Sequence, residues 1–325
     1  MDNKSVLISG AGIAGTTLAY WLKKFGFAPT IVEQAPKLRE GGYAIDFWGA
    51  GFDVAEKMGI VPDLPQADVG ISEVSFVDAN NKRKGGMNYI QLKEMMKGRA
   101  LTLLRSDLAK VIYHHLEKDI EVIFNEDITN LEQSENAVIV TFRNGTSRHF
   151  DLVVGADGLH SNVRSLVFGK ELQFENYYGY YTASFTVETG VSAGTSFLTY
   201  NVPGKQAAVY SLNEQKAATF FIFSSPEKLS YDYPDIEKQK AILSNQFKDA
   251  GWKCAELLSK MDAAPDFYFD VVSQIRMKNW SKGRISLVGD ACDCPSLLSG
   301  QGSTLAMVGA YILAGELNEA NGNYN

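Results

Sequence analysis

The fold of this chain is decided by residues 5–15, which read SVLISGAGIAG. The apolar run Val6–Ile8 leads directly into a G-x-G-x-x-G pattern at Gly10, Gly12 and Gly15, and the following residues carry apolar side chains at helical spacing. A strand, a glycine turn and a helix in this order are typical of a dinucleotide-binding βαβ unit. We expect Gly10 to make the turn, Gly12 to let a pyrophosphate approach the backbone, and Gly15 to let the helix pack closely on the strand.

The residues around and after the glycines support the same prediction. Ile13 and Ala14 lie at the expected helix start, where free N–H groups and the positive end of the helix dipole attract phosphates. A second strand ends at Glu33, where a carboxylate is suited to bind ribose hydroxyls, and Gln34 follows it. Arg39 lies in the next polar turn, where it either contacts the nucleotide or is simply solvated.

The composition indicates a folded protein that binds small molecules. The 325 residues can bury a large core and form two domains, and 45% apolar with 21% charged residues is ordinary for a globular chain. A net charge of −7 without a basic run argues against nucleic acid, and no apolar stretch reaches the roughly 20 residues of a membrane span. Three cysteines form no disulfide framework and no signal peptide precedes the first strand, so we expect a cytoplasmic location.

A change of pattern along the chain predicts that one domain interrupts another. Residues 1–70, 101–174 and 276–325 alternate strands and helices, as expected for a Rossmann-like α/β domain. Residues 175–275 are rich in long β-type runs with Tyr, Phe and Thr, and residues 71–100, which begin with an alternating strand at 71–78, are expected to contribute to the same domain. These runs predict an inserted antiparallel or mixed sheet with one face available to a ligand. The predicted fold class is therefore α/β, with a nucleotide domain and a second, sheet-based domain.

Two local predictions concern helices. Residues 106–117 are expected to form a helix capped by Ser106 or Asp107. Residues 303–317 form a very apolar helical stretch close to the last residue. Because so apolar a helix normally packs under a following segment, we expect that a C-terminal segment is missing.

Two more strands run into turns that contain glycine and an acid. Residues 152–154 lead into Gly155-Ala156-Asp157-Gly158, and residues 285–288 lead into Gly289-Asp290. Ligands bind beyond the carboxyl ends of strands in open α/β sheets, so each turn is a candidate binding loop. A further loop before the apolar helix reads Ser299-Gly300-Gln301-Gly302.

Taken together, these patterns resemble those of the flavin-dependent aromatic hydroxylases, the group A monooxygenases that include p-hydroxybenzoate hydroxylase. Their order, their spacing and the interruption of the first domain match over essentially the whole chain. The resemblance implies that the glycine loop holds the FAD pyrophosphate and that Glu33 binds the adenosine ribose. Arg105, in an R-x-x-L stretch, would reach the flavin end of FAD.

The resemblance also implies roles for the later loops. Asp157 and Gly158 match the D-G motif, which is linked to both FAD and the nicotinamide nucleotide. Asp290, after Gly289, would bind the ribityl hydroxyls. The loop of Gly300, Gln301 and Gly302 would lie against the flavin ring, where its N–H groups would stabilise the negative charge of the reduced flavin.

Residues 291–298 depart from the commonest pattern of these enzymes and read ACDCPSLL. Many relatives have a histidine after Gly-Asp-Ala-Ala and a Pro-Pro pair before Gly-Gln-Gly. The Cys-Pro-Ser version, together with the helix after it, resembles the branch that inactivates tetracyclines and modifies polyketides. The expected substrate is therefore an aromatic or polyketide small molecule.

The implied reaction is centred on the cofactor. NADPH or NADH would reduce FAD, the reduced flavin would take up O₂, and a C4a-hydroperoxide would transfer one oxygen atom to the substrate. No catalytic side chain and no metal are needed, and the protein would be a monomer or a homodimer. Two alternatives remain open: an FAD-dependent reductase or dehydrogenase on the same scaffold, and a non-catalytic flavin- or nicotinamide-binding redox sensor acting through Cys292 and Cys294.

Several residues near these motifs also have purely structural interpretations. Arg164 is expected to pair with Asp157 and fix its loop, and His160 to be a solvated turn residue. Cys292 and Cys294 are expected to be buried thiols, because two cysteines alone fall short of a zinc site. Alternation allows only half of the aromatic residues of the first long β run to face a ligand, and core packing is favoured for each. These are Tyr177, Tyr178, Tyr180, Tyr181 and Phe185.

Overall fold

The central sheet of the computed structural model is built around β1 (Ser5–Ser9). β1 pairs in parallel with β2 and β11, β7 and β18 continue the parallel array, and β17 pairs antiparallel at one edge. The bounds are β2 (Ala28–Glu33), β7 (Glu121–Phe124), β11 (Leu152–Gly155), β17 (Ser281–Lys282) and β18 (Ile285–Leu287). The structure describes residues 4–39, 41–188, 193–230 and 235–324.

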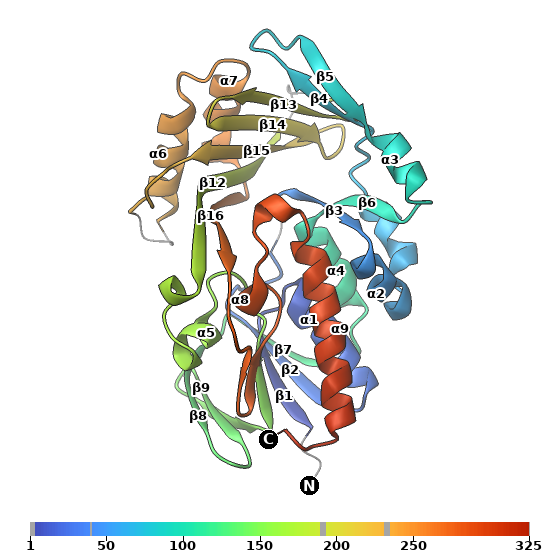
Figure 1. Ribbon diagram of the computed structural model, residues 1–325, viewed down its shortest axis with the longest axis vertical. Coiled ribbons are helices and arrows are strands. Elements are labelled where there is room, and N and C mark those ends of the chain that lie inside the picture. The colour runs from blue at the N-terminus through green and yellow to red at the C-terminus, as the bar shows by residue number, and fades with distance from the viewer. Residues whose placement is uncertain (1–3, 40, 189–192, 231–234, 325) are drawn as a thin grey trace.

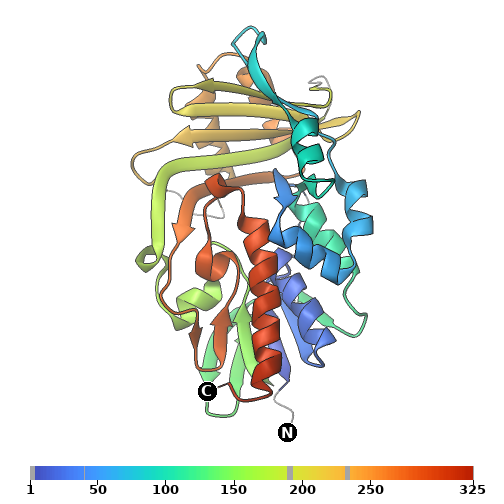
Figure 2. The same ribbon diagram turned by 45° about the vertical axis from the view of Figure 1, so that its right-hand side comes forward.

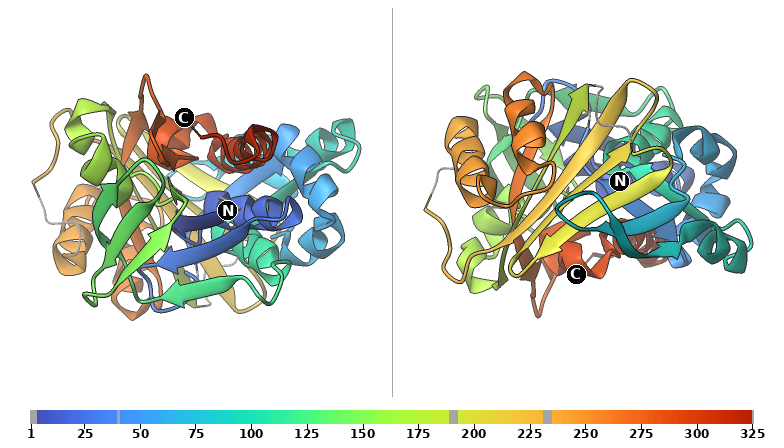
Figure 3. Two further views of the ribbon diagram at one scale, coloured as in Figure 1. Left: turned by 90° about the horizontal axis from the view of Figure 1, so that it is seen from below. Right: turned by 90° about the horizontal axis from the view of Figure 1, so that it is seen from above.

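Both faces of this sheet are covered, which explains why β1 is apolar at successive positions. Val6 and Ile8 pack toward the helices, whereas Leu7 points to the opposite face, toward a three-stranded sheet and α5. Figure 3 (left) shows α1 and α9 on one side of the parallel strands and β8–β10 on the other. These elements are α1 (Ile13–Lys24), α5 (Asn162–Val167), α9 (Gly302–Ala320), β8 (Ile128–Gln133), β9 (Val138–Phe142) and β10 (Ser147–Phe150).

A second sheet lies above the first in Figure 1. Its order is β16-β12-β15-β14-β13-β4-β5, and all neighbours are antiparallel except β4 and β13. The strands are β4 (Glu73–Val77), β5 (Arg83–Asn88), β12 (Glu175–Glu188), β13 (Ser196–Val202), β14 (Lys205–Ser211), β15 (Lys216–Ser224) and β16 (Phe267–Ile275). The prediction of an antiparallel or mixed sheet is confirmed.

One face of this second sheet packs against α6 (Ile236–Phe247) and α7 (Cys254–Ser259), which lie beside it in Figure 3 (right). Tyr181 and Phe185 of β12 are buried in this core, Tyr181 stacking on Phe223 and Phe185 on Phe221. The expected core packing is confirmed for these two aromatic residues. The opposite face, with the alternate side chains of each strand, turns toward the first layer.

The remaining elements connect the two layers. β12 and β16 form one long ladder that descends from the second sheet to the first layer (Figures 1 and 2). The pairing shifts between Tyr177 and Tyr181, where Gly179 has φ +80°, so the ladder bends there. The other connecting elements are β3 (Ala44–Trp48), α2 (Ala50–Met58), η1 (Val61–Ala67), α3 (Tyr89–Met95), β6 (Ala100–Leu104) and α4 (Arg105–His114).

The helix predicted at residues 106–117 is α4, but the predicted cap is wrong. Leu104 occupies the N-cap position, and the helix ends at His114. The chain passes from β6 into the helix without a loop, so Ser106 and Asp107 already lie within its first turn. The apolar stretch 303–317 is helical, as predicted, and lies within α9. Among the described residues, no helix has both the length and the apolar character to cross a membrane.

A buried hydroxyl of the second sheet forms a hydrogen bond with β3. The Tyr210 hydroxyl of β14 accepts a hydrogen bond from the Ala44 N–H at 2.7 Å, and Tyr210 is 1% exposed. We expect Tyr210→Phe to lower the free energy of unfolding by about 1–2 kcal/mol, because the Ala44 N–H loses its partner. Urea unfolding measures this loss of stability. The control is Tyr113→Phe, which alters a half-buried tyrosine of α4. A loss no larger than that of the control would contradict it.

Candidate functional site

The glycine loop after β1 has the geometry that its sequence predicts. Gly10 has φ +105°, and a Cβ there would lie 2.6 Å from the Ala156 carbonyl oxygen. A Cβ on Gly15 would lie 1.9 Å from the Gly10 carbonyl oxygen, so the helix start can approach the turn only with glycine at this position. Gly12 differs, because its φ of −77° suits any residue and its Cβ would meet nothing within 4 Å. The open space at Gly12 fits a ligand that approaches the loop from outside.

Glu33 holds the glycine loop in place. One of its carboxylate oxygens accepts a hydrogen bond from the Ala11 N–H at 2.8 Å, and the other accepts one from the Ala35 N–H at 2.9 Å. Binding of a ribose by Glu33 stays a prediction. Gln34 and Arg39, which follow β2, are both exposed.

Three predicted binding loops meet at one edge of the parallel sheet. β18, β11 and β1 are neighbours, so the loops after them leave from the same carboxyl edge. Their contacts are close: the Gly10 position approaches Ala156, and a Cβ on Gly289 would lie 2.9 Å from the Ala14 side chain. Ile13 and Ala14, in the first turn of α1, are each 7% exposed.

Asp157 stabilises its own loop. Its carboxylate accepts hydrogen bonds from the Ser161 hydroxyl at 2.5 Å and from the Val163 N–H at 3.0 Å. Burial raises the pKa of Asp157, and these two hydrogen bonds act against the rise. Gly158 follows with φ +81°, and a Cβ there would meet nothing within 4 Å.

Arg164 does not pair with Asp157, so that prediction is wrong. The buried guanidinium donates to the Leu159 carbonyl at 2.6 Å, to the Ala291 carbonyl at 2.9 Å, and to Glu171 at 2.8 Å. Its target is Glu171 because the N-terminal turn of α5 already supplies hydrogen-bond donors to Asp157. Arg164 therefore joins the Asp157 loop to α8 (Asp290–Asp293).

A charged cluster forms where α4 begins and β18 ends. Arg105, the first residue of α4, is exposed, and desolvation disfavours its charge. The neighbouring Tyr43, Tyr268 and Asp290 outweigh this desolvation and raise the pKa of Arg105. Burial raises the pKa of Asp290, and Arg105 opposes that rise. An arginine and a neighbouring carboxylate offer both donors and acceptors to a polar ligand.

The start of α9 lies beside this charged cluster. Gly300 adopts the left-handed conformation with φ +64°, and Gln301 is the N-cap of this 19-residue helix. A Cβ on Gly302 would lie 3.8 Å from an Asp290 carboxylate oxygen, which places the helix start beside the β18 loop. First-turn N–H groups have no partner within a helix, and the dipole adds positive potential, so this end suits a ligand with partial negative charge.

His160 is more than a solvated turn residue, so that prediction is wrong. Its side chain is 34% exposed, but Nδ1 lies 3.0 Å from a Glu171 oxygen and Nε2 lies 2.9 Å from an Asp270 oxygen. Partial desolvation disfavours the cation, but the hydrogen bonds with Asp270 and Glu171 prevail and raise the pKa of His160 to about 10. The sequence gives no sign of this, because Asp270 lies 110 residues away.

Cys292 and Cys294 are buried, as predicted. Burial raises the pKa of each thiol to about 12, and the Asp290 carboxylate adds to the rise. Thiolates are the reactive form of cysteine, so these side chains are poorly suited to redox sensing. Over the described ranges, no group of three or more His, Cys, Asp or Glu side chains is placed to hold a metal ion.

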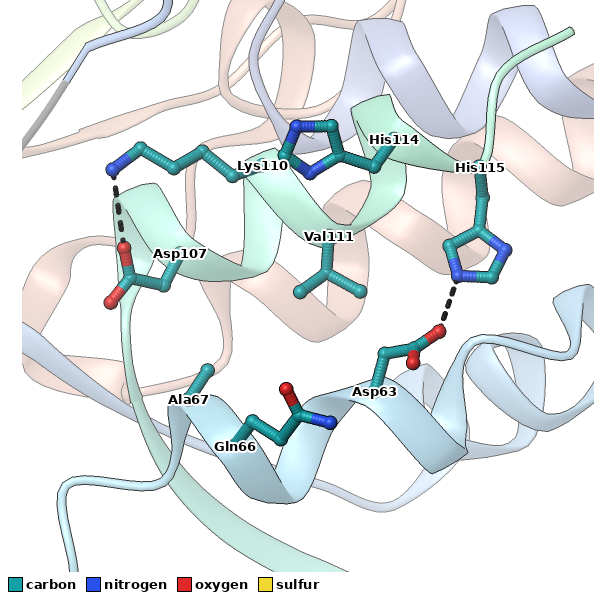
Figure 4. A pocket seen from close by; sticks show the side chains of 8 residues that line it. All are labelled: Asp63, Gln66, Ala67, Asp107, Lys110, Val111, His114 and His115. Carbon is teal, nitrogen blue, oxygen red and sulfur yellow. Dashed lines mark hydrogen bonds and ion pairs between the residues drawn. The ribbon is translucent and has the colours of Figure 1, made fainter.

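A groove of about 520 Å³ lies on the outer side of α4, against η1, and contains none of the predicted site residues (Figure 4). Two contacts between side chains lie along it: His115 Nε2 is 2.6 Å from an Asp63 oxygen, and Lys110 Nζ is 3.5 Å from an Asp107 oxygen. The groove is distinct from the edge where the three loops meet.

The glycine geometry predicts opposite behaviour for two substitutions. Gly12→Val should change the stability of the cofactor-free protein by no more than about 1 kcal/mol, because its side chain meets only open space. It should abolish FAD binding by filling the approach to the loop. Gly15→Val should destabilise the cofactor-free protein by about 3 kcal/mol or more through its clash with Gly10. Urea unfolding and flavin absorbance measure both effects; a Gly12→Val protein that purifies with FAD would contradict the assignment.

The raised pKa of His160 predicts a pH dependence of stability. The pKa of His160 lies above its unfolded value of about 6.5. The stabilisation of the folded state by protonated His160 is therefore complete below pH 6.5 and is lost as the pH rises through about 10. The difference in unfolding free energy between wild type and His160→Gln should therefore shrink between pH 6.5 and 10. Urea unfolding at several pH values measures it, and parallel pH profiles would refute the assignment.

Comparison with known proteins gives the family. A family model described as an FAD binding domain matches residues 3–322. An uncharacterised protein of Mycobacterium tuberculosis is 42% identical over 99% of this chain and 87% of its own length. A flavin-dependent monooxygenase of Legionella longbeachae is 37% identical over 99% of this chain and 82% of its own length.

Solved structures agree with the sequence relatives. The tetracycline destructase Tet(51) has a TM-score of 0.89 at 35% identity, covering 98% of this chain and 83% of its own. Tet(55), another tetracycline destructase, has a TM-score of 0.88 at 38% identity, covering 98% of this chain and 81% of its own. The predicted resemblance and fold class are confirmed, and the chain belongs to the FAD-dependent monooxygenases that share this FAD-binding domain.

Proposed function

We propose that this monooxygenase uses NADPH or NADH and O₂ to insert one oxygen atom into an aromatic or polyketide small molecule of the tetracycline-like class. The observation that carries the proposal is the meeting of three strand-end loops, Arg105 and the start of α9 beneath the second sheet. When bound, FAD supplies the electron transfer and the oxygen chemistry, and the protein orients and shields it. Two solved relatives are described as tetracycline destructases, which supports the substrate class.

The residues at the sheet edge divide into two groups in this proposal. Gly12, Ile13, Ala14 and the N-terminus of α1 would hold the pyrophosphate through their N–H groups, and Glu33 would bind the ribose. Gln34 and Arg39 border the adenosine end. Arg105, Asp290 and the loop of Gly300, Gln301 and Gly302 would hold the flavin end, beside the loop of Asp157 and Gly158. The N–H donors at the start of α9 would favour negative charge on the flavin ring.

The second sheet provides an aromatic cover for this end of the site. Tyr43, which precedes β3, lies with its ring centroid 5.9 Å from that of Phe220 and 5.5 Å from that of Tyr268. Farther along the same face, Phe197 stacks on Tyr210 at 5.3 Å. Flat aromatic faces suit a polycyclic substrate, and covering the flavin excludes water from the reaction. Tyr43 and Tyr268 were not among the predicted site residues, because neither belongs to a motif.

The first experiment is a visible spectrum of the FAD-loaded protein. Adding NADPH without oxygen should bleach the flavin bands, and admitting air should restore them. The same titration with NADH identifies the preferred nucleotide by the faster bleaching. A flavin that neither nucleotide reduces would refute the proposed electron donor.

The second experiment separates oxygen insertion from a reductase activity. Incubation with NADPH, air and tetracycline, followed by mass spectrometry, should give a product heavier by one oxygen atom, and ¹⁸O₂ should add the heavier isotope. The Gly12→Val variant serves as the control. A product that gains hydrogen without oxygen would favour the reductase alternative.

A further inference from the structure

His160 is held between the two layers by carboxylates. It follows the Asp157–Gly158 loop of the first layer and contacts Glu171 at 3.0 Å through Nδ1. Nε2 contacts Asp270 of β16, in the second sheet, at 2.9 Å. A ring whose two nitrogens both face carboxylate oxygens donates from both, and only the doubly protonated imidazolium can do so.

Asp270 links this imidazolium to the flavin end of the site. It is 5% exposed, and its other oxygen accepts a hydrogen bond from the Tyr268 hydroxyl at 3.2 Å. The Tyr268 ring lies against Tyr43, and both tyrosines lie beside Arg105. The negative charge of Asp270 interacts electrostatically with Arg105, Tyr43 and Asp290.

We propose that His160 is a positioning residue of the flavin site: its positive charge neutralises Asp270 and fixes Tyr268, so that Asp270 does not oppose the positive potential of Arg105 at the flavin. The inference rests on the proposed placement of FAD at Arg105 and Asp290. It assigns no direct contact between His160 and the flavin.

The physical consequence concerns the flavin's affinity for electrons. An unbalanced carboxylate close to the ring disfavours the added negative charge of reduced flavin, because charges in a partly desolvated site are weakly screened. Loss of the His160 charge leaves Asp270 unbalanced, and loss of both charges restores the balance. A purely structural role for His160 would not give this pattern of opposite and cancelling shifts.

The test is a potential titration of the FAD-loaded protein against a reference dye. At a fixed potential, His160→Gln should lower the ratio of reduced to oxidised FAD by roughly 3- to 10-fold, and Asp270→Asn should raise it by a similar factor. The double variant should return to within about twofold of wild type, and His160→Lys, which keeps the charge, should do the same. His115→Gln is the matched control, because it removes another histidine–aspartate contact on the outer side of α4.

The experiment still tests the proposal if one of the variants does not fold. His160→Gln leaves a buried carboxylate without its cation, which is costly. In that case the double variant is compared with Asp270→Asn, and its ratio should be lower by the same roughly 3- to 10-fold. A His160→Gln protein that binds FAD with the wild-type ratio would overturn the inference alone, as would a double variant equal to Asp270→Asn. Wild-type protein that takes up no FAD would overturn the proposed function together with this inference.

Discussion

The parallel pairing of β18, β11 and β1 is the constraint on which the rest of the structure depends. It brings loops from the beginning, the middle and the end of the chain to one edge of one sheet. The close approach of Gly15 to Gly10 keeps α1 tight against this edge. With either the register or the glycines altered, the glycine loop, the Asp157 loop and Asp290 would no longer lie side by side.

The second layer depends on this arrangement but follows different packing rules. Its outer face forms an apolar core with α6 and α7, which frees the inner face from the need to be uniformly apolar. Buried Thr182 and Ser184 therefore alternate along β12 with the core residues Tyr181, Ala183 and Phe185. The inner side of β12 therefore carries hydroxyl side chains where its outer side carries the apolar core.

The sequence predicted those parts of the site that lie in continuous motifs. Gly10, Gly12, Asp157 and Asp290 could be brought together because strand ends in a parallel sheet meet at a common edge. Side chains whose partners come from the second sheet could not be placed. The contact of His160 with Asp270 requires the register of β16, which no local pattern specifies. Alternation likewise divides the aromatic residues of β12 into two faces without saying which face is the core.

The chain passes between the two layers near residues 72, 99, 175 and 276. The second sheet is therefore connected to the first layer at several points along the chain rather than attached at one end. Moving this sheet from one relative to another would require all four junctions to be matched at once, two of them at the ends of the β12–β16 ladder. Substitution of side chains on a retained sheet requires no such match, so it is the simpler way to alter what the sheet contacts.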